Sequence, residues 1–124
     1  MVRSSFDQLT ANTSREGATI TLTCSGSAET DALSHLRVVL STLHEEALRT
    51  STRDVVADIR ALEFATSSCL KELVTWLMRV IELDDDRRYQ VRFRSNPRHS
   101  WQRRSLGALA AFAGNVVQIE AEAS

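Results

Sequence analysis

The fold of this chain is decided at Asp58-Ile59-Arg60-Ala61-Leu62-Glu63-Phe64-Ala65-Thr66-Ser67-Ser68-Cys69-Leu70-Lys71. An apolar run at residues 55–57 leads into this stretch and is typical of a strand covered on both faces. Beyond it, apolar side chains recur at helical spacing, at Leu70, Leu73, Val74, Leu77 and Ile81. We therefore predict that the chain passes here from the end of a buried strand, through a short turn, into a helix that begins near Ser67.

The segments on either side alternate between strand and helix patterns. Residues 19–24 alternate threonine with apolar side chains, which predicts a strand that ends at Ser25-Gly26-Ser27. Leucines on one face predict a helix over residues 31–50. The remaining elements are a helix over residues 67–83, a strand over 89–94, a helix over 100–114 and a strand over 115–120. This order predicts an α/β fold with a mostly parallel four- to five-stranded sheet and helices packed against it.

The size and composition of the chain indicate one ordinary globular domain. Its 124 residues suffice for a single core, which we place in a domain at residues 18–124. Residues 1–17 are polar, with Phe6 and Leu9 as apolar anchors, and form either a loose terminus or an edge strand. No apolar stretch is long enough for a membrane span and no secretory signal opens the chain, so we expect a cytoplasmic protein. Cys24 and Cys69 lack metal or redox spacing and are expected to be buried thiols.

Basic side chains gather in one segment, from Arg87 to Arg104, and no acidic residue follows Asp86 until Glu120. Such a segment can contact nucleic acid or an acidic protein. Lys71 is the only lysine among the 15 Lys and Arg residues, and a skew this strong reflects a GC-rich genome more than a binding duty. We therefore rank nucleic-acid binding below binding to a protein partner.

The sequence offers little support for an enzyme. The four glycines are scattered, so no phosphate-binding loop is formed, and no histidine pair has metal spacing. His35 and His44 lie on the predicted helix and are expected at its surface. Asp58 and Glu63 stand five positions apart around a strand end, which does not suit a close acid–base pair. We predict no catalytic residue, no metal and no cofactor.

Three consecutive hydroxyl residues open the central helix. One hydroxyl at this place serves as a helix cap, because the first N–H groups of a helix lack partners. Three exceed what a cap needs. A phosphate carries about −1.5 to −2 charges and is tolerated at a helix N-terminus, so a phosphorylation switch is the second interpretation.

The same residues resemble a known family. An aspartate after apolar residues, a phenylalanine and then a serine opening a helix, here Asp58, Phe64 and Ser67, are similar to the motif of the STAS domain. This is the SpoIIAA-like fold of bacterial anti-sigma-factor antagonists. The nine positions from Asp58 to Ser67 match the motif, and Gly26 after the earlier strand also fits. The resemblance covers about residues 18–120.

The closer likeness is to a divergent subgroup of small STAS-like signalling regulators. Its typical features are Ser-Ser-Cys-Leu-Lys before a helix with a tryptophan, here Ser67 to Trp76, and the Ser95-Asn96-Pro97 and Trp101-Gln102-Arg103-Arg104-Ser105-Leu106 segments. A related set of such proteins regulates a diguanylate cyclase through a kinase and a phosphatase. The resemblance implies a GHKL-type serine kinase or anti-sigma factor and a PP2C-type phosphatase as partners.

By this resemblance, Ser67 is the phosphorylated position, with Thr66 and Ser68 as alternative acceptors. The sequence departs from the family at Thr66, where an aspartate is usual, and at Cys69, where a glycine is usual. The implied partner-binding residues are Gly26, Asp58, Thr66, Ser67, Ser68, Cys69, Lys71 and Glu72. We expect a non-catalytic regulator that switches protein partners by phosphorylation. The alternatives are a constitutive scaffold, which includes a homodimer, and nucleic-acid binding through the arginine segment.

Overall fold

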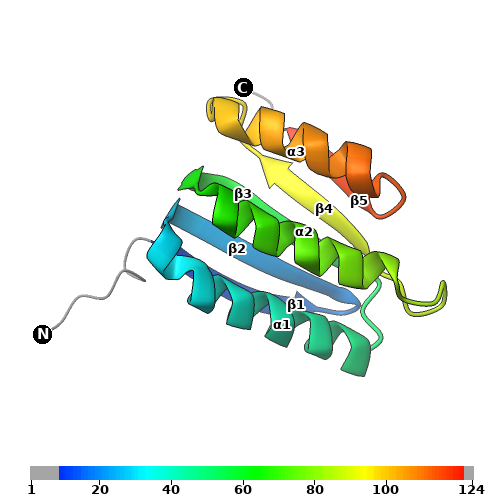
Figure 1. Ribbon diagram of the computed structural model, residues 1–124. Helices are drawn as coiled ribbons and strands as arrows, with labels where there is room; N and C mark the ends of the chain where they lie inside the picture. Colours follow the sequence, from blue (N-terminus) through cyan, green and yellow to red (C-terminus); the bar gives the residue numbers. More distant parts are fainter. Residues whose placement is uncertain (1–8, 122–124) are drawn as a thin grey trace, which may run out of the picture.

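The computed structural model describes residues 9–121. They form a single five-stranded sheet and three α-helices, with one short 3₁₀ turn (Figure 1). The elements in chain order are β1 (Leu9–Glu16), β2 (Thr19–Ala28), η2 (Thr30–Ala32), α1 (Leu33–Arg49), β3 (Asp54–Ala65), α2 (Ser67–Ile81), β4 (Gln90–Ser95), α3 (Ser100–Ala113) and β5 (Val117–Ala121). The predicted α/β order is confirmed.

The strands lie in the sheet in the same order as in the chain, β1-β2-β3-β4-β5. β1 is antiparallel to β2, and the four strands from β2 to β5 are parallel. Each parallel step moves in the same direction, and right-handed crossovers therefore put all three helices on one face, as Figure 1 shows. β1 lies at one edge of the sheet, and the domain boundary predicted at residues 17 and 18 falls in the turn between β1 and β2. Phe6 lies outside the described residues.

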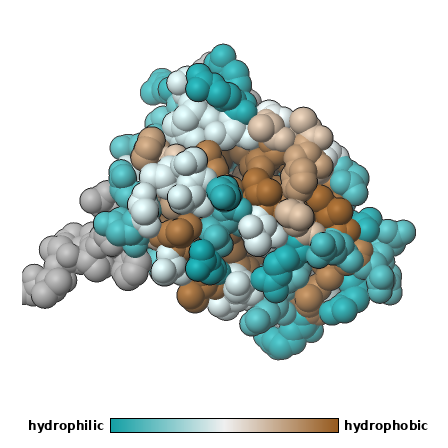
Figure 2. Space-filling model, in the orientation of Figure 1, coloured by the Kyte–Doolittle hydropathy of each residue, from teal (hydrophilic) through white to brown (hydrophobic). Residues whose placement is uncertain are grey.

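The core fills the space between the sheet and the helix layer. Strand residues on the covered face alternate with residues on the other, open face, as the period of two requires. The covered face carries Ile20, Leu22, Val55, Ala57, Val91 and Phe93, all buried. Leu36, Leu40 and Leu43 of α1 and Trp76, Leu77 and Val80 of α2 pack against them. Hydrophobic residues also reach the surface of the helix layer, as Figure 2 shows. Met78 of α2 and Phe112 of α3 are among the exposed large apolar side chains.

Two predicted strand ends are wrong. β2 does not stop at Ser25-Gly26-Ser27 but continues to Ala28, with Gly26 at φ +87° between Leu9 and Leu62 of its neighbours. The glycine can adopt this positive φ, which accompanies the shift in β2–β3 register between Gly26 and Ser27. The strand continues past it because both β1 and β3 pair with β2 at this point. β3 does not end near Asp58 but continues to Ala65, so Asp58 lies in mid-strand and the expected turn after it is absent.

His44 was expected at the surface but is buried, with 4% of its area exposed. Its Nδ1 lies 2.7 Å from the hydroxyl of Tyr89, and that hydroxyl also accepts a hydrogen bond from Trp76 Nε1 at 2.8 Å. All three groups are satisfied when the tyrosine proton is donated to Nδ1 of a neutral imidazole. Burial, together with the charges of Arg79 and Arg87, lowers the pKa of His44 and favours this neutral form. The chain of hydrogen bonds joins α1, α2 and the start of β4.

Candidate functional site

The turn from β3 to α2 lies at the carboxyl ends of β2 and β3. Thr66 is the N-cap of α2: its φ of −71° and ψ of 162° are extended, and its hydroxyl accepts a hydrogen bond from Cys69 N at 3.2 Å. Its own N–H donates to Ala28 O at 2.9 Å, which ties the turn to the end of β2. A threonine here satisfies one of the N–H groups that every helix leaves open.

The three hydroxyls of the turn have different surroundings. Thr66 is half-buried and serves as the cap, and Ser68 is half-buried as well. Ser67 is the first residue of α2 and is exposed. Its hydroxyl makes no hydrogen bond to any residue in the described range 9–121. Ser67 is therefore the hydroxyl of the three that a second protein can reach without disturbing the cap.

Other side chains around Ser67 divide into exposed groups and groups already engaged. Lys71, one helical turn further along α2, is exposed, and so is Phe64, with 45% of its area open. Glu72 instead receives two hydrogen bonds from Arg37 of α1, at 3.2 and 3.1 Å. The sequence indicates a role for Phe64 only through its place in the family motif.

Cys69 and Gly26 contribute to the turn from inside. The Cys69 side chain is buried, and its thiol donates to Glu29 O at 3.4 Å. The residue thus holds the loop after β2 against α2 and does not present its side chain to a partner. Gly26 lies within the sheet, paired with Leu62, two residues before the end of β2.

The last part of β3 has a strand on one side only. Pairing with β4 ends at Asp58 and Arg94, whereas pairing with β2 continues to Ala65. Three side chains from the segment after β4 take the place of the missing strand. Gln102 Nε2 donates to Ile59 O at 2.7 Å and Leu62 O at 2.8 Å, Asn96 Nδ2 to Arg60 O at 3.3 Å, and Trp101 Nε1 to Glu63 O at 2.7 Å. These residues belong to the two segments that resemble the STAS-like subgroup, and their role here is to hold the strand that leads to Ser67.

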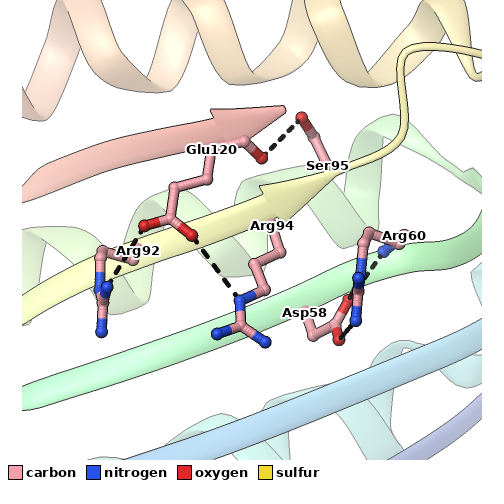
Figure 3. A network of polar contacts seen from close by, with 6 residues as sticks. All are labelled: Asp58, Arg60, Arg92, Arg94, Ser95 and Glu120. Atoms are coloured by element: carbon pink, nitrogen blue, oxygen red, sulfur yellow. Dashed lines mark hydrogen bonds and ion pairs between the residues drawn. The ribbon is translucent and has the colours of Figure 1, made fainter. Parts of the chain in front are cut away.

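Asp58 lies apart from Ser67, on the open face of the sheet (Figure 3). Arg60 binds its carboxylate through Nε at 2.9 Å and Nη2 at 2.7 Å. These hydrogen bonds lower the pKa of Asp58, and Arg94 adds a smaller effect of the same sign. The eight groups predicted for partner binding therefore separate into a cluster at the start of α2 and residues held within the sheet.

The arginine segment does not form one surface. Arg92 and Arg94 project from the open face, where both contact Glu120 of β5, at 3.2 and 3.7 Å (Figure 3). Arg88 donates to the carbonyls of Ile81 and Leu83 and so closes the end of α2. Arg103 is exposed on α3, on the helix side of the sheet. A single nucleic-acid strand would have to wrap around the sheet to reach all of them, which weakens that alternative.

The described residues contain no candidate metal site and no candidate membrane-spanning helix. Over residues 9–121, no group of three or more His, Cys, Asp or Glu side chains is arranged to hold a metal ion. Within the same range, no helix has the length and apolar character needed to cross a membrane.

Comparison with known proteins identifies the fold. No protein-family model and no curated protein matches the sequence. Among solved structures, an anti-sigma factor antagonist from Mycobacterium paratuberculosis is similar, with a TM-score of 0.66, 17% identity, and coverage of 89% of this chain and 86% of that chain. SpoIIAA in its unphosphorylated form gives a TM-score of 0.47, 13% identity, and coverage of 69% and 71%. The chain has the STAS-like, SpoIIAA-like fold of the anti-sigma factor antagonists, as its motif predicted.

Proposed function

We propose that the protein is a non-catalytic bacterial signalling regulator of the anti-sigma-factor-antagonist type, in which phosphorylation of Ser67 controls docking to a protein partner. The observation that carries the proposal is the state of Ser67. Ser67 is exposed at the first position of α2, and its hydroxyl is not needed as the helix cap because Thr66 provides the cap. The fold, shared with an anti-sigma factor antagonist, supports the same class of function.

A phosphate on Ser67 would be tolerated by the protein itself. It would face the positive end of the α2 dipole, and Lys71 lies four residues along the same helix face. A partner packed against Phe64, Ser67 and Lys71 would instead meet new bulk and about two negative charges. Phosphorylation therefore changes the docking surface without unfolding the domain.

The proposed partners follow from the class. A GHKL-type serine kinase, which can itself be the anti-sigma factor, would add the phosphate, and a PP2C-type phosphatase would remove it. The target is a signalling protein such as a diguanylate cyclase. Thr66 in place of the usual aspartate keeps the cap, so the turn retains its shape while it lacks one charge that a kinase of this class reads.

The test compares two serines that begin helices. Ser67 begins α2 and Ser100 begins α3, and both are exposed. An aspartate at either place adds the same charge to a helix N-terminus. We expect Ser67→Asp to weaken partner binding at least about tenfold, about 1.4 kcal/mol, and Ser100→Asp to leave it unchanged, as measured by calorimetry with a partner from the gene neighbourhood.

The acceptor is identified separately. The protein is incubated with the neighbouring kinase and ATP, and the product is mapped by mass spectrometry. Phosphate on Ser67, absent from a Ser67→Ala variant, is the expected result. If residues 66–68 stay unmodified while the partner binds, and Ser67→Asp binds as well as the original protein, the domain is a constitutive interaction module and the switch is refuted.

A further inference from the structure

β1 is an edge strand that is open to pairing. It has eight residues in unbroken register with β2, and among residues 9–121 nothing pairs with its outer side. Natural proteins protect such edges with proline, bulges, very short strands or inward-pointing charges. β1 contains no proline and no bulge, and its charged side chains, Arg15 and Glu16, stand only at its end. The opposite edge, β5, has five residues.

The hairpin turn defines which backbone groups are open. Gly17 has φ +62°, which suits the first position of a two-residue turn, and the flanking Glu16 and Thr19 are paired. In such a hairpin the flanking pair exchanges both hydrogen bonds, and bonded pairs then alternate along the strands. The N–H and C=O groups of Ala11, Thr13 and Arg15 therefore point away from β2.

An apolar groove runs beside this edge. It lies between the covered face of β1 and α1, has a volume of about 400 Å³, and includes Ala11, Ile20, Val38, Val39 and Leu43 among its lining residues. Val38 is 62% exposed, the most open of the large apolar side chains in the described range. The open backbone groups of β1 can pair with another strand, and the apolar groove beside them can bury an apolar helix face. The same edge of a second copy of this chain offers both, because its own β1 lies beside its own α1.

We infer that β1 pairs with β1 of a second copy of this chain, in antiparallel orientation about a two-fold axis near Asn12. This arrangement lets Thr13 exchange hydrogen bonds with Ala11 of the second copy and places Arg15 opposite Leu9, so no like charges face each other. Parallel pairing would put Arg15 beside Arg15. The joint sheet brings the two α1 helices toward each other and covers Val38 in both copies.

The inference goes beyond the proposed function and needs neither a kinase nor a partner. The unphosphorylated full chain is measured alone by light scattering after size exclusion, and we expect a mass twice the 13.8 kDa of one chain. Thr13→Pro removes an outward N–H without breaking the β1–β2 ladder, and Val38→Lys places a charge in the groove. Each is expected to weaken the dimer at least about tenfold, whereas Phe112→Lys, on α3, leaves it intact.

Val38→Lys alters an exposed helix position, so it remains a valid test if Thr13→Pro fails to fold. A mass of one chain at concentrations up to about 1 mM would overturn the inference. A dimer that persists in both folded variants would overturn it as well, because the contact would then lie elsewhere. Neither result bears on phosphorylation of Ser67.

Discussion

The hydroxyl of Thr66 accepts a hydrogen bond from the backbone N–H of Cys69 at the start of α2. Because Thr66 provides the helix cap, the hydroxyl of Ser67, the proposed phosphorylation site, is not needed for that structural role. Thr66 is the cap of α2, and the thiol of Cys69 donates a hydrogen bond to Glu29 O in the interior. Ser67, which lies between them in the sequence, is exposed. Adjacent hydroxyls are thus expected to respond differently to the same substitution.

Thr66→Ala should lower the free energy of unfolding by about 1 kcal/mol, because the Cys69 N–H loses its acceptor. Ser67→Ala is the matched control and should change it by less than about 0.5 kcal/mol. Urea titration followed by tryptophan fluorescence measures both. Equal effects would mean that Thr66 is not the working cap.

Thr66→Asp restores the residue that is usual in the antagonists. Aspartate caps helices as well as threonine does and adds favourable charge at the N-terminus, so stability should be kept or raised. We expect faster phosphorylation of Ser67 by the neighbouring kinase, measured by phosphate incorporation over time. An unchanged rate would show that the kinase does not read this position.

Gln102→Leu should destabilise the protein by at least about 2 kcal/mol. The side chain is fully buried and bonds Ile59 O, Leu62 O and Asn96 N, and each buried group left unsatisfied costs about 1–3 kcal/mol. Hydrogen exchange should rise first around the end of β3. Gln118→Leu on the exposed part of β5 serves as the control and should have little effect.

Acid should destabilise the protein through His44. Burial lowers its pKa below the ordinary 6.5, so the unfolded chain binds the proton more tightly than the folded one. This contribution to stability is complete above pH 6.5 and is lost as pH falls through the folded pKa. Urea titrations between pH 7 and pH 5 should show the decline, and His44→Gln, which does not titrate, should reduce it. An unchanged slope in that variant would assign the effect to other groups.

Both cysteines should resist alkylation in the native state. Burial, with a smaller effect of Asp58, raises the pKa of Cys24 to about 12, and Cys69 is equally enclosed. Iodoacetamide should add no label to the folded protein at pH 8 and two labels in urea, counted by mass spectrometry. Rapid labelling of the native Cys69 would show that the turn opens.

The order of elements, the parallel sheet and the start of α2 at Ser67 were predictable, because each rests on periodicity or local motif. The end of β3 was not, since its carbonyls bond to Asn96, Trp101 and Gln102, which lie more than 30 positions further along the chain. The local sequence at Gly26 predicted a strand end, but β2 continues through it because β1 and β3 pair with it on both sides. His44 stands four residues after Leu40, on the buried face of α1, and this spacing was a better guide than its polarity.

The strand order has a consequence for how the chain folds. Because every strand lies beside the one that precedes it in sequence, each new strand meets an edge that has already formed, beginning with the β1–β2 hairpin. No strand must wait for a later segment to be inserted between two earlier ones. The sheet can therefore grow in the direction of synthesis. α3 joins near the end, and only then can Trp101 and Gln102 bond to the carbonyls of β3.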